Sequence, residues 1–459
     1  MNRTVRCAST PSVTRTSSIV LGAALFVAAS CGDAEPPGSG SADADTGILS
    51  LSGTDSDSDG QGSAGSSGMK LDVGDSPGGP GPGGDCPGGS GGAPGDEYEF
   101  SVIWIANSPE GTVSKIDTVT AQEIARYRTG PGDPDPSRTS VNLQGDVAIA
   151  NRAGSVTKIA AEEERCVDKN GNGTIETSQS PDDVLAWGED ECVLWHHEVG
   201  FQPVSGNDGG PRAIAWDGGN TKVCNAKPNL WVGWRDQPNP TSIVRKYDGQ
   251  TGEVLGEAEI IDWQGNWGHG TYGGAADGEG AFWVLGTLGT LVRVDPETYE
   301  LERWDNPASH VMYGIALDAN GDPWLAGYGG KLWHFDRTTE TFEDMGETAG
   351  GPGRLRGLMI DQNGDAWIAG NNPCALVRFD TKNRTLVDGS IPLPGCQVPV
   401  GVSIDVDGMV WVVDRNASVA FKVDPADYST QTVEGLVSPY TYSDMTGAGL
   451  GLVVHPPPA

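Results

Sequence analysis

Short apolar runs that each open on a tryptophan recur along the chain from about residue 100 onward. Six copies and a seventh without tryptophan are Trp104–Asn107, Trp231–Trp234, Trp283–Gly286, Trp324–Gly327, Trp367–Gly370, Trp411–Asp414 and Ala148–Asn151. Their short length and their flanking turn residues predict buried β-strands.

A second kind of run follows most copies after twelve to thirteen residues and ends in aspartate, at Asp117, Asp295, Asp336, Asp380 and Asp424. The copies at Lys158–Ala160 and Lys246–Asp248 depart slightly from this spacing. Several tryptophan runs are also preceded by a glycine and an apolar stretch that ends in an Asp-rich turn, as in Gly314–Gly321 and Gly357–Gly364. Alternating strands joined by Asn-Gly or Asp-Gly turns predict β-hairpins.

The repeat spacing predicts the architecture. Successive copies lie 44, 83, 52, 41, 43 and 44 residues apart, and 40 to 45 residues is about the size of one four-stranded propeller blade. The gap of 83 contains one blade and an insertion at about 161–205. We therefore expect an all-β, seven-bladed β-propeller over residues 98–455, with an open β-solenoid as the alternative.

The first blade lacks a strand before its tryptophan run. Residues Tyr442 to Val454 provide an apolar segment at the far end of the chain. We expect this C-terminal segment to pair as a strand into blade one, because radial β folds protect their sheet edges by closure.

The order of a Gly-Ile strand, an Asp-x-x-Gly turn, a Trp-apolar strand and an Arg-x-Asp strand resembles the Vgb-like propellers, named after the streptogramin B lyases, and more loosely the NHL propellers. In those lyases the tryptophan strand ends in a glutamate near a magnesium ion. The matching positions here, Gly327 and Gly370, are glycine, and none of the seven copies carries glutamate. The resemblance therefore implies the fold without the lyase metal site.

Two loop histidines, His269 and His310, are the candidate catalytic residues, since either could act as a general base toward a bound substrate. The competing interpretation is a loop histidine that hydrogen-bonds to a neighbouring turn. No Ser/His/Asp spacing and no organic cofactor motif occurs in the sequence. Lyase or hydrolase activity is accordingly the alternative to a binding or scaffold role, and a purely structural envelope component is a third hypothesis.

The loops that enter the blades should gather at one end of the propeller channel. The residues expected on this ligand-binding face are Arg138, Arg212, Tyr272, Tyr313, Arg354, Arg356, Tyr440 and Tyr442. Loops after the tryptophan strands add Asn107, Asn151, Trp234, Tyr328, Asn371 and Arg415. Arginines among aromatic residues suit an anionic or sugar-like ligand, although arginines there could also satisfy carbonyls at strand ends.

The insertion contains a candidate calcium loop. Side-chain oxygens at Asp168, Asn170 and Asn172, followed by Gly173, match the first, third, fifth and sixth positions of a calcium-loop template, and Thr174 and Glu176 extend the ligand set. Gln179 stands where the template has glutamate, so Asp183, Asp190 or Glu191 would have to complete the shell. A metal-free Asn-Gly turn is the alternative.

The N-terminal region has the layout of a secretory signal over residues 1–30, with three arginines before the apolar stretch Ile19–Ala29. Its end, Ala28-Ala29-Ser30-Cys31, resembles a bacterial lipobox, which implies acylation of Cys31 and a lipid anchor at the cell envelope, on the periplasmic or outer-membrane surface. Cleavage at an ordinary small-residue site is the alternative.

Residues 31–97 are rich in Gly, Ser, Pro and Asp and predict a disordered tether. The net charge of −34 argues against nucleic acid as a partner, because phosphate backbones are bound through clustered Lys and Arg. The expected partners are the membrane, through the anchor, and an unidentified small molecule, glycan or protein.

Six cysteines remain after Cys7 and Cys31, and an even number in an exported chain favours disulfides. We expect Cys166 to pair with Cys192 and Cys374 with Cys396, because each pair brackets one local excursion. The remaining two are Cys86 and Cys224.

Overall fold

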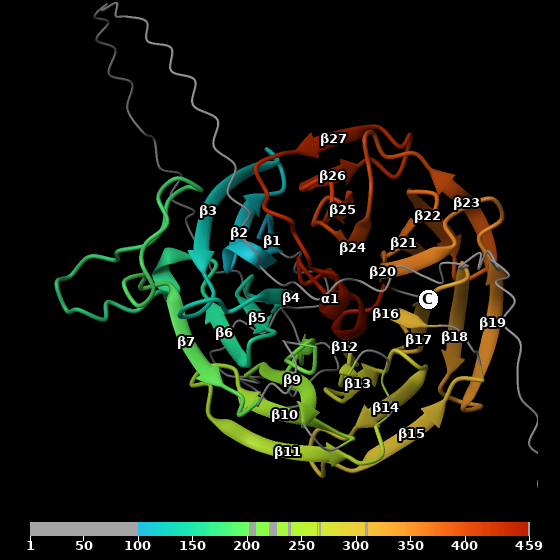
Figure 1. Ribbon diagram of the computed structural model, residues 1–459, viewed down its shortest axis with the longest axis horizontal. Coiled ribbons are helices and arrows are strands. Elements are labelled where there is room, and N and C mark those ends of the chain that lie inside the picture. The colour runs from blue at the N-terminus through green and yellow to red at the C-terminus, as the bar shows by residue number, and fades with distance from the viewer. Residues whose placement is uncertain are drawn as a thin grey trace, which may run out of the picture. The chain divides into compact units, whose positions relative to one another are not determined.

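The computed structural model describes residues 100–201, 208–219, 227–236, 240–263, 265, 268–307 and 311–457. These residues form seven antiparallel sheets arranged radially around one axis, which is a seven-bladed β-propeller (Figure 1). The predicted signal peptide and tether, together with Cys31, Cys86 and Cys224, lie outside the described residues. No helix in the described part of the chain is both long enough and apolar enough to cross a membrane.

The first three blades hold eleven strands. They are β1 (Val102–Asn107), β2 (Thr112–Asp117) and β3 (Gln122–Arg128); β4 (Pro136–Val141), β5 (Val147–Asn151), β6 (Ser155–Ile159) and β7 (Val193–Glu198); and β8 (Ala213–Trp216), β9 (Asn229–Asp236), β10 (Thr241–Asp248) and β11 (Val254–Ile260). Short 3-10 turns lie at Ser108–Glu110 and Glu163–Arg165.

The other four blades have four strands each. They are β12 (Gly273–Ala276), β13 (Phe282–Leu285), β14 (Thr290–Val294) and β15 (Leu301–Asp305); β16 (Met312–Leu317), β17 (Pro323–Gly327), β18 (Lys331–Asp336) and β19 (Thr341–Glu347); β20 (Arg354–Ile360), β21 (Asp365–Asn371), β22 (Ala375–Asp380) and β23 (Thr385–Ile391); and β24 (Pro399–Ile404), β25 (Val410–Asp414), β26 (Val419–Val423) and β27 (Thr430–Val433). One helix, α1 (Ala448–Val454), follows.

The repeated tryptophans are the core of the blades. All six are at most 1 % exposed, and burial of such a side chain is worth about 3–5 kcal/mol against alanine. In four blades the indole N–H donates to the aspartate of the preceding turn, at 2.8 to 3.1 Å, in the pairs Trp283 with Asp277, Trp324 with Asp318, Trp367 with Asp361 and Trp411 with Asp405. The sequence pattern of turn aspartate and tryptophan is thus one packing unit.

A basic side chain from the third strand completes this unit in most blades. The ion pairs are Lys158 with Asp146, Lys246 with Asp217, Arg293 with Asp277, Arg378 with Asp365 and Lys422 with Asp405. Blade five has His334 at this place, 4.7 Å from the Trp324 ring and facing Asp322. A titratable group therefore replaces a permanent cation in one blade.

The C-terminal segment differs from the expected strand. Residues 448–454 form the helix α1, whose Leu450 and Val453 pack on Ile214 and Leu317 at the end of the channel where the inner strands finish. The residues before the helix lie beside β1: the backbone N–H of Tyr440 donates to Ala106, and that of Trp104 donates to Met445. They form one isolated bridge there, between Asn107 and Pro439, and no regular strand.

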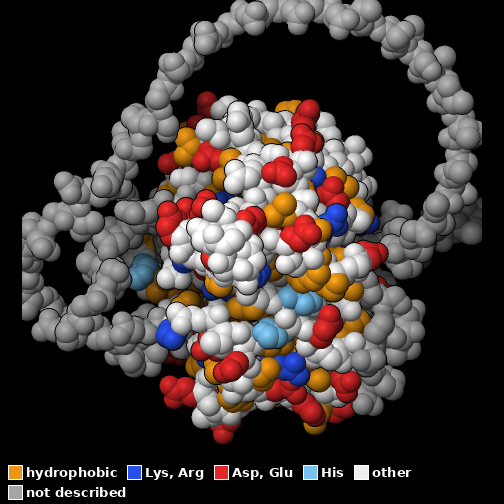
Figure 2. Space-filling model, turned by 90° about the vertical axis from the view of Figure 1, so that its left-hand side faces the viewer, with side chains coloured by type: hydrophobic (Ala, Val, Ile, Leu, Met, Phe, Trp, Pro, Cys, Tyr) orange, Lys and Arg blue, Asp and Glu red, His pale blue; other side chains and the backbone are white. Residues whose placement is uncertain are grey.

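The insertion is shorter than the sequence suggested. It lies within blade two, between Ile159 and Val193, because β7 (Val193–Glu198) already pairs with β6 as the outer strand of that blade. The flank that includes β7 carries many acidic and few basic side chains, in keeping with the net charge of −34 (Figure 2).

Candidate functional site

Four tyrosines meet at the end of the channel where the inner strands begin. The hydroxyl of Tyr440 lies 3.1 Å from that of Tyr272 and 2.6 Å from that of Tyr313. The Tyr442 ring centroid is 4.6 Å from that of Tyr313 and 5.7 Å from that of Tyr272. All four side chains are buried, so blades four and five and the C-terminal segment are joined by one aromatic cluster.

The repeat explains this convergence. The residue five positions before the turn aspartate lies at or near the start of the inner strand, and this position is Arg212, Tyr272, Tyr313 and Arg356 in four successive blades. Equivalent positions of a propeller lie at equal height around the axis. The sequence therefore places two tyrosines flanked by two arginines in one layer.

Six guanidinium groups surround the tyrosines. Their carbons lie between 2.9 and 5.7 Å from ring centroids, in the contacts of Arg138 with Tyr442, Arg152 with Tyr440, Arg212 with Tyr272, Arg354 with Tyr328, Arg356 with Tyr313 and Tyr328, and Arg415 with Tyr440. We call the set Arg138, Arg212, Arg356, Tyr272, Tyr313, Tyr440 and Tyr442 the arginine–tyrosine cluster. All eight predicted face residues lie in or beside it.

Arg138 is the most enclosed of these side chains, with no exposed surface. Its Nη1 donates to the backbone carbonyl of Ser137 at 3.0 Å, while its Nε and Nη2 have no hydrogen-bond partner. Burial lowers the pKa of Arg138 to about 10, against the opposing effect of Tyr272 and Tyr440. The group stays protonated at neutral pH with one edge unpaired.

Arg212 is the second buried guanidinium, 4 % exposed, and its Nε is also without a partner. Neither Arg138 nor Arg212 forms an ion pair with any acidic side chain in the described part of the chain. Arg152 differs, because it pairs with Asp135. Two positive charges therefore share a buried site without a counter-charge from these residues.

Arg152 and Arg235 were not among the predicted residues. Both stand four positions after the start of the tryptophan-type run, the place that Tyr328 and Arg415 occupy in other blades. Only Arg152 reaches the tyrosines, over Tyr440 at 5.2 Å. A consistent count along the repeats would have identified it.

His269 lies beside this cluster, with its ring centroid 4.9 Å from that of Tyr272. Its Nδ1–H donates to the backbone carbonyl of Asp208 at 2.7 Å. Burial, and then the charge of Arg212, lower the pKa of His269 to about 2. The ring is therefore neutral at physiological pH and a weak base. His310, the other candidate base, lies outside the described residues.

A small apolar cavity continues the channel below this layer. Its volume is about 40 Å³, and it is lined by Ser140, Ile214, Gly274, Ile315, Leu358 and Leu450, among others. The first five stand two residues after Arg138, Arg212, Tyr272, Tyr313 and Arg356. Because alternate residues of a strand share a face, the cavity lies about 7 Å deeper along the same channel.

The candidate calcium loop is closed by its own side chains. Asp168 accepts backbone N–H groups of Gly171 and Gly173 at 2.6 and 2.9 Å. The side-chain amides of Asn170 and Asn172 each donate to the Glu176 carboxylate at 2.7 Å. These hydrogen bonds, that from Asn172 first, lower the pKa of Glu176. The side chains predicted to bind calcium are thus held by hydrogen bonds to other groups of the same loop.

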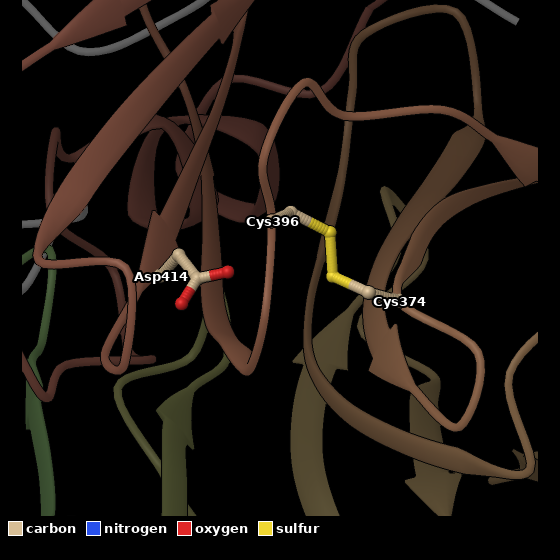
Figure 3. A group of neighbouring side chains, drawn as sticks. All are labelled: Cys374, Cys396 and Asp414. Carbon is tan, nitrogen blue, oxygen red and sulfur yellow. A yellow bond between two sulfur atoms is a disulfide. The ribbon is translucent and has the colours of Figure 1, made fainter.

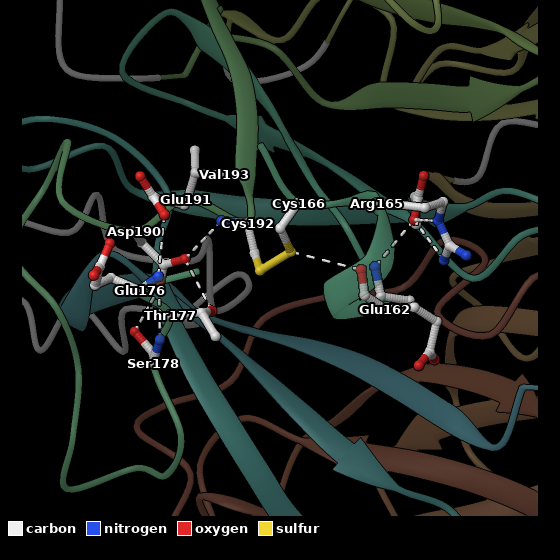
Figure 4. The surroundings of a disulfide bond; sticks show 12 residues. Glu162, Arg165, Cys166, Glu176, Thr177, Ser178, Asp190, Glu191, Cys192 and Val193 are labelled. Carbon is white, nitrogen blue, oxygen red and sulfur yellow. Dashed lines mark hydrogen bonds and ion pairs between the residues drawn. A yellow bond between two sulfur atoms is a disulfide. The ribbon is translucent and has the colours of Figure 1, made fainter. Parts of the chain in front are cut away.

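Two of the three acids proposed to complete the shell contact this region (Figure 4). The buried Glu191 accepts the backbone N–H groups of Lys169 and Glu176 at 2.7 and 3.1 Å. Asp190 accepts the backbone N–H of Ser178 at 2.9 Å, two residues beyond Glu176. The disulfide between Cys166 and Cys192 is present and brings both acids to the loop. The third acid, Asp183, donates its backbone N–H to the carbonyl of Ser180 at 3.2 Å, outside the loop.

The second predicted disulfide, between Cys374 and Cys396, is also present. Asp414 lies next to it (Figure 3), and the three residues resemble a metal-binding group. Both sulfurs are bonded to each other, and Asp414 accepts the backbone N–H groups of Gln397 and Val398 at 2.7 and 3.1 Å. This arrangement fastens the loop before β24 and leaves no thiolate for a metal.

Asp318, Asp322 and His334 form a second close group of possible ligands. His334 Nδ1 lies 2.7 Å from Glu343 and its Nε2 lies 3.6 Å from Asp322. Although burial opposes it, these carboxylates raise the pKa of His334. The group is the blade-five form of the structural cation and carboxylate unit.

The propeller is similar to several solved structures. A streptogramin B lyase is 16 % identical with a TM-score of 0.48 and covers 68 % of this chain and 87 % of its own. Virginiamycin B lyase from Staphylococcus aureus is 12 % identical, with a TM-score of 0.48 and coverage of 68 % and 89 %. A protein of unknown function from Bacteroides caccae is 13 % identical, with a TM-score of 0.40 and coverage of 61 % and 90 %.

No protein-family model matches the sequence, and no curated protein matches it either. The solved structures include the streptogramin B lyases that the repeats resemble. At this level of identity the likeness concerns the fold alone. The function has to be argued from the residues of this chain.

Proposed function

We propose that the protein is an exported, lipid-anchored binding module of the cell envelope whose propeller holds an anionic ligand at the arginine–tyrosine cluster. The observation that carries this proposal is the pair of buried guanidinium groups, Arg138 and Arg212, without a carboxylate partner among the described residues. Burial of an unpaired charge is costly. A ligand that supplies the counter-charge removes that cost.

Binding without chemistry suits the site better than lyase or hydrolase activity. A general base works best when its pKa lies near the working pH, whereas the pKa of His269 is lowered to about 2. The positions that match the lyase glutamate carry glycine at Gly327 and Gly370. His269 then lines the site as a neutral side chain that forms hydrogen bonds.

Ligand capture from an extract of the source cells tests the binding role. The full chain is equilibrated with the extract and analysed by native mass spectrometry, beside Arg138→Met and Arg212→Met. The proposal expects a bound mass on the unmodified chain that both variants lose. A mass retained by both variants would refute binding at this cluster.

The lipid anchor is tested separately. Cells that express the chain are labelled with an alkyne fatty acid, beside Cys31→Ser and the matched control Cys7→Ser. We expect label on the unmodified chain and on Cys7→Ser, and none on Cys31→Ser. Label that survives in Cys31→Ser would remove the anchor from the proposal.

A further inference from the structure

The geometry points to a small apolar carboxylate as the ligand, with its carboxylate on the free edge of Arg138 and its hydrocarbon end in the channel cavity below. This inference rests on the proposed function, and it adds the chemical class of the ligand. Three features of the site carry it: the unpaired edge, the missing counter-charge and the cavity.

The unpaired edge of Arg138 has the shape of a carboxylate. Nε and Nη2 are the two atoms without partners, while Nη1 is held by the carbonyl of Ser137. The Nε and Nη2 hydrogens point the same way and form a two-pronged donor that matches two carboxylate oxygens. The Tyr442 hydroxyl is buried and likewise has no partner, so a third donor is present beside the Arg138 guanidinium.

No acidic side chain among the described residues pairs with Arg138 or Arg212; Asp444, which lines the cavity, accepts the backbone N–H groups of Gly447 and Leu450 instead. Between residues 100 and 457 the undescribed segments are 202–207, 220–226, 237–239, 264, 266–267 and 308–310, and none contains Asp or Glu, whereas Glu99 directly precedes the described residues. Arg138 and Arg212 both lie over the Tyr272 ring, at 5.0 and 5.4 Å. Their mutual repulsion is relieved by one anion placed between them.

The size of the site favours a singly charged, compact ligand. The unpaired donor atoms at the cluster are Nε and Nη2 of Arg138, Nε of Arg152 and of Arg212, and the Tyr442 hydroxyl, and the two on Arg138 share one edge that matches two carboxylate oxygens. A phosphate dianion brings three terminal oxygens and a larger desolvation cost into the same buried space. A carboxylate therefore fits the Arg138 edge at the lower desolvation cost.

The apolar cavity accounts for the rest of the ligand. It holds about 40 Å³ and is lined mainly by apolar groups such as Ile214, Ile315 and Leu358. Its place about 7 Å below the arginine layer corresponds to a chain of a few carbon atoms. Acetate would reach only the upper layer, whereas butyrate would also fill the cavity.

Saturation-transfer NMR with acetate, propionate, butyrate, butyramide and inorganic phosphate tests this assignment on the full chain. We expect affinity to rise from acetate to butyrate, the butyrate methyl protons to receive the most saturation, and butyramide to bind at least about tenfold more weakly because it lacks the charge. Equal binding of butyrate and butyramide, or displacement of butyrate by equimolar phosphate, would overturn the carboxylate assignment.

Arg138→Lys keeps the charge and removes the two-pronged edge, so butyrate affinity should fall on the order of tenfold. The matched control is Arg245→Lys, because Arg245 also stacks on an aromatic ring, that of Trp234 at 4.8 Å, but is paired with Glu257. Circular dichroism checks that both variants fold. Unchanged butyrate affinity in Arg138→Lys, or an equal loss in Arg245→Lys, contradicts the inference.

The acidic segment 31–97 is a second source of carboxylates, and a variant distinguishes it from a free ligand. Its twelve Asp and Glu residues are changed to Asn and Gln in an otherwise complete chain. A free ligand predicts unchanged butyrate affinity. A severalfold rise would show that the segment itself occupies the site, which overturns the assignment to a small molecule.

The outcomes separate the two proposals. If the extract yields a ligand that Arg138→Met loses, while butyrate fails to bind the unmodified chain, the ligand class is wrong and the binding role stands. If the extract ligand persists in Arg138→Met and Arg212→Met, the binding role at this cluster is wrong as well.

Discussion

Arg138 and Arg212, which belong to neighbouring blades, both contact one aromatic ring: their guanidinium carbons lie 5.0 and 5.4 Å from the centroid of Tyr272. The aromatic face offers a partial negative charge to both groups, but it does not replace a full counter-ion. In such a site the two positive charges repel each other until an anion binds. Two consequences can be measured, one for stability and one for binding.

The ligand-free protein should gain stability when Arg138 is replaced by an apolar side chain of similar length. We expect Arg138→Met to raise the free energy of unfolding by about 1 kcal/mol or more, because an uncompensated buried charge is removed. Urea denaturation at pH 7 measures this value.

Arg126→Met is the matched control for that measurement. Arg126 is also buried but pairs with Glu110 and Glu123 at 3.1 and 2.7 Å. Its removal leaves both carboxylates uncompensated and should cost about 3 kcal/mol. If Arg138→Met destabilises the protein as much as Arg126→Met does, the unpaired state of Arg138 is wrong.

Blade five should make the stability of the propeller depend on pH. Asp322 and Glu343 raise the folded pKa of His334, so the charged pair stabilises the fold below the unfolded histidine pKa of about 6.5. That contribution is lost as the pH rises through the higher folded pKa. His334→Arg, which copies blades four and six, should therefore gain about 1 kcal/mol over the unmodified protein at high pH, and little at pH 5.

The converse substitution is the control for this prediction. Arg378 pairs with Asp365 at 2.6 Å in blade six. Arg378→His should therefore make a second contribution to stability depend on pH, present at low pH and lost as the pH rises. Thermal unfolding from pH 5 to pH 9 records both variants. A His334→Arg advantage that is constant across this range would contradict the assigned role of His334.

Calcium should order the loop of the insertion. With Ca²⁺ bound, the oxygens of Asp168, Asn170 and Asn172 would turn toward the ion, and Asp168→Ala would abolish binding. Calorimetric titration with CaCl₂ and hydrogen exchange of residues 168–176 measure the effect. Asp183→Ala is the control, because it leaves the side chains of the loop unchanged. Absence of heat and of added protection at millimolar Ca²⁺ would favour the metal-free turn.

The disulfide between Cys166 and Cys192 should stabilise the insertion and leave the blades largely unaffected. The insertion holds its backbone through Asp190 and Glu191, and the bridge closes a loop of 26 residues, for which about 3 kcal/mol is typical. Cys166→Ser with Cys192→Ser should therefore speed proteolysis within residues 166–192 while β6 and β7 stay protected. Cleavage spread over all blades would contradict this local role.

The fold could be predicted from sequence because its period is carried by residues that pack in the same way in every blade. Trp324, Trp367 and Trp411 each donate to the aspartate six positions earlier, so spacing and packing agree. The tail could not be predicted in the same way. Its apolar residues Leu450, Leu452 and Val453 fill the channel end as a helix, and a short apolar run fits a strand or a helix equally well.

The candidate site was predictable as a set of positions and not as a set of contacts. Counting from the turn aspartate places Arg212, Tyr272 and Arg356 in one layer, because equivalent strands are related by the propeller axis. Loops of irregular length decide which arginines pair with carboxylates. Asp135 reaches Arg152, and no repeat position foretells that pair or the unpaired edge of Arg138.

A crystal structure of the full chain grown with butyrate would show whether this edge of Arg138 receives a ligand carboxylate. We expect both carboxylate oxygens within hydrogen-bond distance of Nε and Nη2, with the alkyl chain in the cavity beside Ile214 and Leu358. Density for butyrate elsewhere, or an acidic side chain of the chain itself against that edge, would contradict it.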